Sequence, residues 1–336
     1  MKAWQLQAFG RENLALNDVP QPEPGAGEVL VRISAVSLNY RDKLLYDGAY
    51  NPHLAFPMTQ VADAVGEVAA LGSGVRRFKV GDRVVTNYCT RWMDGKPTSK
   101  ETLYSLGNII PGALAEYLVL GEEALVSAPV YLTNEEAAAL PCAGLTAWYS
   151  LVEKGGLKAG DTVLVQGTGG VSIFGLQIAA ALGAKVIVTS SSDEKLERAK
   201  KLGAQYTINY KKNPEWDKEA LALTNGQGVD QILEVVGGSN LARSLNAISP
   251  EGQISIIGII DGFNSDLPLF SAIQKHAVLR GISVGPRRAL EDMLRKFDEL
   301  QLRPVIDTVY SFADARKAFD HLERGAFGKI VIRVRE

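Results

Sequence analysis

The chain has few residues that could cross-link it or hold a metal ion, with 2 cysteines and 3 histidines among 336 residues. Two cysteines form at most one bridge, which excludes the disulfide framework of small secreted proteins. Chains without such a framework are typical of reducing compartments. We therefore expect a cytoplasmic protein.

Strong charge and long hydrophobic runs are also missing. The formal net charge is −2, which gives no reason to expect nucleic acid or an anionic lipid surface as a partner. No stretch approaches the roughly 18 apolar residues of a membrane helix. Residues 1–6 include a lysine but lead into no apolar run, which argues against a cleaved secretion signal. We expect a globular protein with neither a membrane nor a nucleic-acid partner.

The pattern along the chain predicts two domains. Residues 28–33 alternate as a strand does, and frequent glycines and prolines around them favour a partly closed antiparallel barrel. From Thr162 onward, strand, glycine turn and helix repeat, which predicts a doubly wound parallel sheet. The C-terminal segment is mixed again and too short for a third domain. We therefore predict an α/β protein in which a β-rich domain, residues 1–125 and 286–336, is interrupted by a Rossmann domain at residues 126–285.

A glycine-rich turn is the strongest local signal. Residues 167–172 read Gly-Thr-Gly-Gly-Val-Ser between a predicted strand and a predicted helix. Gly167 allows the tight turn, and Gly169 lets the backbone approach a pyrophosphate at the helix N-terminus. Ser172 stands where Gly or Ala is usual. A glycine turn without a nucleotide is the alternative, but the neighbouring strand–helix units favour a dinucleotide site. The residues predicted to bind in this turn are Gly167, Thr168, Gly169, Gly170 and Val171.

The end of the next predicted strand bears on which dinucleotide is bound. An NAD site usually has an acidic residue there for the ribose 2′-hydroxyl, whereas this chain has Ser190 and Ser191, with Lys195 in the helix that follows. Hydroxyls and a lysine suit a 2′-phosphate, so we expect the cofactor to be NADPH. The alternative is that Ser191 and Glu194 only form a capping box for that helix. Both interpretations can hold, because the cap uses neither Ser190 nor Lys195.

Taken together, a set of short strings resembles the medium-chain dehydrogenase/reductase superfamily over essentially the whole chain. The resemblance is nearest to the quinone-oxidoreductase-like and zinc-type alcohol-dehydrogenase-like branch. The strings are VGEV at 65–68, GSGV at 72–75, FKVGDRV at 78–84, GALAEY at 112–117, LPCAGLTA at 140–147, GA at 203–204 and INY at 208–210. The resemblance implies a GroES-like catalytic domain interrupted by the Rossmann domain, an active site in the cleft between them, and hydride transfer from a nicotinamide.

Further site residues follow from this resemblance alone. It implies that Thr146 contacts the nicotinamide end, while Tyr210 and Lys195 flank the adenosine phosphate. Thr146 could instead be a helix residue used in packing, and Tyr210 a half-buried aromatic at a strand end. Asp63 matches a family carboxylate whose usual role is structural, in pairing with a cation.

Departures from the family pattern concern its metal. Zinc enzymes of this family hold the catalytic ion with a Cys, a His or similar residue, and a second Cys. The matching positions here are Asn39, Ala62 and Cys142, and a single thiolate cannot hold a zinc ion that needs at least three protein ligands. The segment that matches the four-cysteine structural lobe contains Cys89 alone. We therefore predict no metal, and a small buried packing role for Cys142.

These features predict NADPH-dependent reduction of a quinone or an α,β-unsaturated carbonyl compound, since such an acceptor can take hydride without a Lewis acid. We expect Asn39 to orient the nicotinamide ribose or the substrate carbonyl. Tyr46 and Tyr50 are candidate hydrogen-bond donors, with loop packing as the alternative. A zinc-free alcohol or aldehyde oxidoreductase, or a non-catalytic NADPH-binding protein, remains open.

The sequence also suggests how the chain assembles. The last Rossmann strand, predicted at residues 278–284, carries four large aliphatic residues and one charge, and it should lie at the edge of the sheet. Exposed edges of this kind invite pairing with another strand. We expect a two-fold homodimer through residues 258–284, an arrangement that the resemblance also implies. The alternative is that this segment packs as a lid inside its own subunit.

Overall fold

The computed structural model describes residues 1–335 and divides into two compact units, residues 1–145 with 284–336 and residues 146–283. The second boundary lies within two residues of the predicted one. The first lies farther along the chain than predicted, because helix α3 (Asn134–Ala138) packs on strands of the first unit. Within the described part of the chain, no helix is long and apolar enough to cross a membrane.

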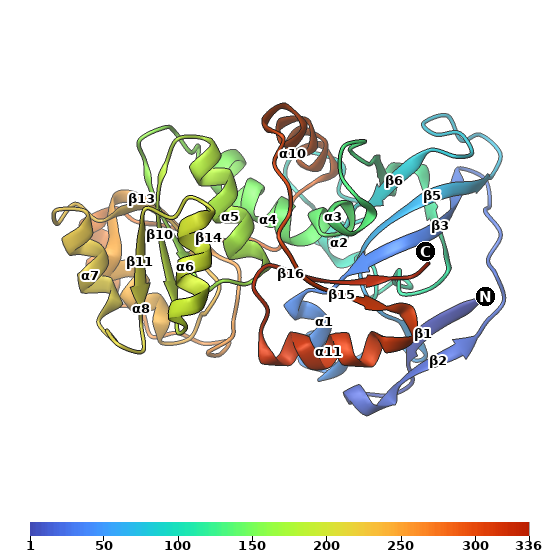
Figure 1. Cartoon of the computed structure of the whole chain (residues 1–336), viewed down its shortest axis with the longest axis horizontal. Helices are drawn as coiled ribbons and strands as arrows, with labels where there is room; N and C mark the ends of the chain where they lie inside the picture. Colours follow the sequence, from blue (N-terminus) through green and yellow to red (C-terminus); the bar gives the residue numbers. More distant parts are fainter. Residues whose placement is uncertain (336) are drawn as a thin grey trace. The chain divides into compact units, whose positions relative to one another are not determined.

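The first unit is built on two mainly antiparallel sheets (Figure 1). In the larger sheet the strand order is β15-β16-β3-β5-β6-β8, with β7 paired to β3, and the smaller sheet has the order β2-β1-β4. The strands are β1 (Lys2–Leu6), β2 (Leu14–Asp18), β3 (Glu28–Ser37), β4 (Met58–Thr59), β5 (Asp63–Leu71), β6 (Arg83–Thr86), β7 (Tyr117–Gly121), β8 (Leu125–Ser127), β15 (Ile306–Ser311) and β16 (Lys329–Arg333). The β-rich first domain, completed by the C-terminal segment, is therefore confirmed.

Helices at the strand ends position the polar residues of this unit. Its helices, besides α3, are α1 (Tyr40–Tyr46), α2 (Ser99–Leu103), α10 (Arg287–Leu300) and α11 (Ala315–Arg324). Helix α1 begins shortly after β3 because the backbone N–H of Asn39 donates to the Asp42 carboxylate over 2.8 Å. This bond is half of a capping box, and it holds Asn39 in extended conformation at the turn from strand to helix.

The second unit contains a six-stranded sheet in which every pairing is parallel. The strand order is β11-β10-β9-β12-β13-β14, which is the doubly wound order of a dinucleotide-binding fold. Its strands are β9 (Thr162–Gln166), β10 (Lys185–Ser190), β11 (Tyr206–Asn209), β12 (Val229–Glu234), β13 (Ile248–Ile256) and β14 (Val278–Gly281). The predicted Rossmann sheet is confirmed, and β14 lies at its edge as expected.

The strand order fixes where a ligand can bind on this sheet. The chain first adds strands on one side of β9 and then, from β12 onward, on the other. Ligands of such sheets bind beyond the carboxyl ends of the strands at this point of reversal. The turn after β9 leads into α5 (Gly170–Ala181), and the remaining helices are α4 (Leu145–Trp148), α6 (Asp193–Lys201), α7 (Trp216–Leu223), α8 (Asn240–Ala247) and α9 (Leu269–Lys275).

Candidate functional site

The glycine turn between β9 and α5 has the geometry of a pyrophosphate site. Gly167 has φ +72°, a conformation that favours glycine. A Cβ atom built on Gly169 would meet no atom within 4 Å, so the space beside its backbone is open. No side chain caps the start of α5, which leaves its first amide groups for an anionic ligand. These residues therefore fit a dinucleotide, as predicted.

Two further residues explain how helix and strand approach each other so closely at this turn. The buried Ser172 hydroxyl donates to the backbone oxygen of Gln166 over 2.6 Å, so the departure from Gly or Ala ties the helix to the strand end. A Cβ on Gly175 would lie 2.3 Å from the Leu233 side chain on β12. Close helix–sheet packing therefore depends on Gly175, which our reading of the sequence did not include.

A buried carboxylate, Glu234 at the end of β12, forms hydrogen bonds that connect the end of β9, next to the glycine turn, with the loop after β12. The Gln166 side chain donates to Glu234 Oε2 over 2.9 Å, which links the ends of β9 and β12. Glu234 Oε1 accepts from the backbone N–H groups of Val236 and Gly237, each over 2.9 Å. This carboxylate fixes the loop that precedes α8. Local sequence patterns do not single out Glu234 as a site residue, although an acidic residue inside an apolar strand is a usable signal.

The residues predicted to select the cofactor lie near the ends of β10 and β11. Ser190 is the last residue of β10, as expected, and its backbone oxygen accepts from the Tyr210 N–H over 3.1 Å. The Tyr210 side chain is 41% exposed. Ser190, Ser191 and Tyr210 therefore lie at one corner of the sheet, with Lys195 in the first turns of α6.

The predicted capping box at Ser191 and Glu194 is wrong. The cap of α6 is Ser192, whose hydroxyl accepts from the Lys195 N–H over 3.3 Å. The helix begins at Asp193, which makes Ser192 and not Ser191 its N-cap residue. The correction leaves the Ser191 side chain outside the cap.

Thr146 is buried at the start of the second unit. Its hydroxyl lies 3.3 Å from the backbone oxygen of Ser283 and donates to it. This bond is consistent with the alternative that Thr146 has a packing role. Its contact with nicotinamide stays a prediction.

In the first unit, Asn39 belongs to a buried polar network. The Asn39 amide donates to Asp63 Oδ2 over 2.9 Å, and its oxygen accepts from Lys329 Nζ over 2.6 Å. Lys329 Nζ lies 3.6 Å from Asp63 and also donates to the backbone oxygen of Leu38 over 2.7 Å. Burial raises the pKa of Asp63 to about 6, although Lys329 and Asn39 act in the opposite direction. Lys329 is thus the cation that the resemblance implied for Asp63.

The residues at the family's zinc positions do not fit a zinc ion. Both ends of the Asn39 amide are taken by Asp63 and Lys329, and Ala62 has no donor atom. Cys142 is the one residue of the three that carries a sulfur, and a single thiolate cannot hold a zinc ion. In residues 1–335, no three side chains of His, Cys, Asp or Glu are grouped as a metal site.

The structure separates the two predicted tyrosines. The Tyr50 hydroxyl lies 3.3 Å from that of Tyr88, and both rings flank the Arg41 guanidinium. The Tyr46 hydroxyl instead donates to Glu323 on α11 over 2.8 Å. Burial raises the pKa of the Tyr46 hydroxyl above its usual value, and the hydrogen bond to Glu323 raises it as well. The structure therefore does not bring Tyr46 to the Asn39 network, and its placement favours the packing alternative.

Arg41, Tyr50 and Tyr88 form a second cluster, the Arg41 group. Both this group and the Asn39 network lie near the thiol of Cys142. Cys142 interacts electrostatically with Asp63 and Lys329 and also with Arg41. A polar site of buried cations, carboxylates and tyrosine hydroxyls is therefore assembled in the first unit around Asn39 and Cys142.

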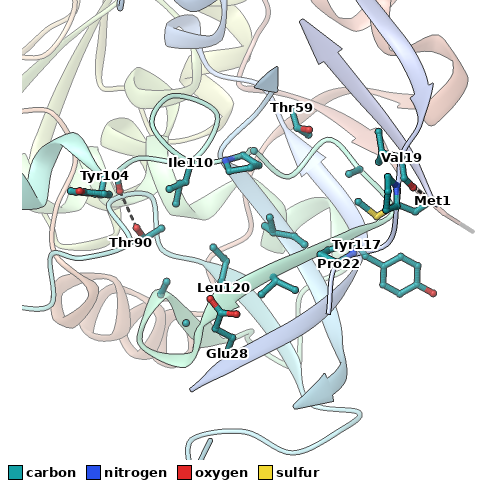
Figure 2. Close-up of a pocket in the computed structure, with 18 of the residues that line it drawn as sticks. Met1, Val19, Pro22, Glu28, Thr59, Thr90, Tyr104, Ile110, Tyr117 and Leu120 are labelled. Atoms are coloured by element: carbon teal, nitrogen blue, oxygen red, sulfur yellow. Dashed lines mark hydrogen bonds between the residues drawn. The ribbon is translucent and has the colours of Figure 1, made fainter. Parts of the chain in front are cut away.

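The first unit also has a cavity of about 620 Å³ that lies apart from this polar site. Figure 2 shows Thr59, Tyr104, Tyr117 and Leu120 among its lining residues. Neither the Asn39 network nor the Arg41 group contributes to its walls. The candidate site is therefore the polar cluster and not this cavity.

Comparisons with known proteins agree with the architecture. The family described as alcohol dehydrogenase GroES-like domain matches residues 25–130, and the family described as zinc-binding dehydrogenase matches residues 170–299. A zinc-type alcohol dehydrogenase-like protein of Schizosaccharomyces pombe is 42% identical over 324 residues, which cover 94% of this chain and 93% of the relative. A quinone oxidoreductase of Pseudomonas aeruginosa is 36% identical over 263 residues, which cover 78% of this chain and 74% of the relative.

Solved structures give the same result. A Sinorhizobium meliloti 1021 protein described as an alcohol dehydrogenase has a TM-score of 0.94 and 48% identity, and the match covers 99% of this chain and 98% of the other. An NAD-dependent alcohol dehydrogenase has a TM-score of 0.90 and 36% identity over 100% of each chain. This chain therefore belongs to the medium-chain dehydrogenase/reductase superfamily, an oxidoreductase family whose members use NAD(P), in its alcohol dehydrogenase-like and quinone oxidoreductase-like branch.

Proposed function

We propose that this protein is an NADPH-dependent reductase of quinones or α,β-unsaturated carbonyl compounds that works without zinc. The observation that carries the proposal is the Asn39 network. Where zinc relatives have metal ligands, this chain has an amide committed to Lys329 and Asp63 and an alanine without a donor atom. An acceptor activated by its own conjugation needs no metal to receive hydride. The quinone oxidoreductase relative supports the same class of acceptor.

The bound cofactor would supply the hydride, and the residues of this chain would hold and select it. The turn at 167–171 offers backbone N–H groups to the pyrophosphate. Ser190, Ser191, Lys195 and Tyr210 would surround the 2′-phosphate. Asn39 keeps one amide N–H beyond its bonds to Asp63 and Lys329, and this N–H would orient the nicotinamide ribose or the acceptor. Each of these roles is one of binding or positioning.

The reaction is tested with chelator-treated protein in two assays, one with NADPH and a panel of quinones, enones and aldehydes, and one with NADP⁺ and a panel of alcohols. We expect NADPH oxidation with quinones or enones at a rate that the chelator does not change. One zinc per chain, lost together with activity on chelation, would contradict the proposal. Faster turnover of alcohols or aldehydes would favour the second candidate, a zinc-free alcohol oxidoreductase; two relatives are named as alcohol dehydrogenases, one of them as zinc-type. NADPH binding without any turnover would identify a binding protein.

Cofactor preference is a separate prediction. We expect NADPH to bind more tightly than NADH because no acidic residue ends β10 and Lys195 supplies positive charge. Lys195→Ala removes one charge-assisted contact, worth about 1.5–3 kcal/mol, or roughly one to two decades in NADPH affinity. Fluorescence titration with both nucleotides measures the effect.

The matched control is Lys201→Ala, which removes an exposed lysine at the far end of the same helix. It should leave both affinities unchanged. An unaltered NADPH/NADH ratio in Lys195→Ala would remove Lys195 from the site. A wild-type preference for NADH would overturn the NADPH assignment itself.

A further inference from the structure

The Arg41 side chain is a buried cation with unusually few partners. It is 7% exposed, and its Nη1 donates to the backbone oxygen of Leu106 over 2.7 Å. Its Nε and Nη2 atoms are buried and have no hydrogen-bond partner among residues 1–335. Asp42 Oδ1 lies 3.7 Å from Nη1 and forms an ion pair with it, but at this distance it accepts no hydrogen bond from the guanidinium. Most of the donors of this guanidinium are therefore unused.

Such an arrangement is costly for the fold. Burial of a charged group with unmet donors is strongly unfavourable unless something pairs with it. A buried polar group left unsatisfied in a native structure calls for an explanation, such as a catalytic role or a bound ligand. The unused donors of Arg41 thus point to a ligand that completes their hydrogen bonds.

The surroundings of Arg41 indicate which chemistry that ligand has. The guanidinium carbon lies 5.3 Å from the centre of the Tyr50 ring and 5.0 Å from that of Tyr88. Tyr88 is 3% exposed whereas Tyr50 is 41% exposed, so Tyr50 is the partly exposed residue of the pair. Arg41 also interacts with Cys142, at a position that holds metal in zinc relatives. A cation and two hydroxyl donors suit an oxygen that carries or acquires negative charge.

We propose that Arg41, with the hydroxyls of Tyr50 and Tyr88, binds the carbonyl oxygen of the acceptor and stabilises the charge that forms on it. This inference rests on the proposed reductase function. Hydride brings two electrons and forms a C–H bond at the conjugated carbon, and the displaced π electrons come to rest on the carbonyl oxygen. A proton from solvent, passed through the Tyr50 hydroxyl, completes the product. Arg41 performs the polarising work that zinc performs in other members of the family.

The test uses full-length Arg41→Met with NADPH and a series of aryl enones whose ring substituents vary their electrophilicity. Loss of a donor to a developing oxyanion costs about 100- to 1000-fold in kcat. We expect a loss of this size for the least electrophilic enones and a smaller one for a strongly electrophilic quinone. The dependence of rate on the substituent should therefore steepen. Arg41→Lys, which keeps the charge, should recover part of the rate.

Arg76→Met, which removes an exposed arginine of the same unit, is the matched control and should behave as wild type. NADPH affinity should be the same in all variants. Equal loss of rate across the whole series, or no loss, would overturn the role of Arg41. If Arg41→Met does not fold, Tyr50→Phe tests the same site, and an unchanged substituent dependence there would count against it. A wild-type protein that reduces no acceptor would contradict the reductase function instead.

Discussion

Lys329→Met is expected to destabilise the first unit by about 3–5 kcal/mol, because it leaves the buried Asp63 carboxylate without its cation. Lys329 is 2% exposed and makes hydrogen bonds to Leu38 and Asn39 as well as the contact with Asp63. Methionine has a similar length and fills the space without the charge. Urea-induced unfolding of wild type and variant measures the difference.

The pH dependence of this effect has a definite sign. Burial raises the pKa of Asp63 from 3.8 to about 6, so its contribution to stability is complete below about pH 3.8 and is lost as the pH rises through about 6. Lys329 lowers the pKa of Asp63. Without Lys329 this pKa is higher, so the loss of stability with rising pH continues to a higher pH. The destabilisation caused by Lys329→Met should be larger at about pH 7.5 than at about pH 4.5.

A double variant separates the ion pair from general packing. Lys329→Met combined with Asp63→Asn leaves neither charge buried alone, and at neutral pH it should be more stable than Lys329→Met by itself. Lys96→Met, at an exposed position of the same unit, should change stability little at any pH. A Lys329→Met penalty that does not vary with pH would show that Asp63 is not coupled to Lys329.

Substitution of Phe270 and Ile273 by glutamate is expected to convert a dimer into monomers. We propose that the edge of the Rossmann sheet pairs with a second copy of the chain. Large apolar side chains are exposed throughout residues 258–284, the segment predicted to form the interface. They are Ile260 at 58%, Phe263 at 67%, Leu269 at 68%, Phe270 at 71%, Ile273 at 69% and Val278 at 38%. Large exposed apolar residues gathered in one segment are typical of an interaction surface.

The structure corrects two details of the predicted edge. Strand β14 ends at Gly281, so it is shorter than the predicted 278–284. Ile282 and Val284 are buried inside the chain, and the Ile282 N–H donates inward to Ile256 over 2.9 Å. A proline at Ile282 would therefore break a bond within the sheet, and glutamates on α9 are a cleaner probe of the interface.

Light scattering over a range of concentrations tests the assembly. Wild type should have twice the mass of one 36.2 kDa chain, and the Phe270→Glu, Ile273→Glu variant should have the mass of one. Leu103→Glu, at a residue that is 57% exposed in the other unit, is the control and should stay dimeric. A wild-type mass of a single chain at every concentration would rule out the dimer and favour the lid alternative.

The sequence by itself determined the Rossmann architecture, because each strand, glycine turn and helix is encoded by neighbouring residues. Gly167 needs its left-handed backbone for a turn that spans a few positions, and the order of strands follows from repeated strand–helix units. The departures at Asn39 and Ala62 were likewise visible, since they depend only on which residue stands at a position.

Only the tertiary structure decided which distant side chains meet. Lys329 reaches Asn39 across 290 positions of the chain, because β16 pairs with β3. Long-range packing likewise turns Tyr46 toward Glu323, whereas Tyr50 lies against Arg41 within its own segment. Local patterns treat these tyrosines alike, since both follow the same strand. The two tyrosines differ only in their tertiary contacts, because Tyr46 bonds to Glu323 on α11 and Tyr50 lies beside Tyr88. Such contacts leave no periodic signal in a single sequence.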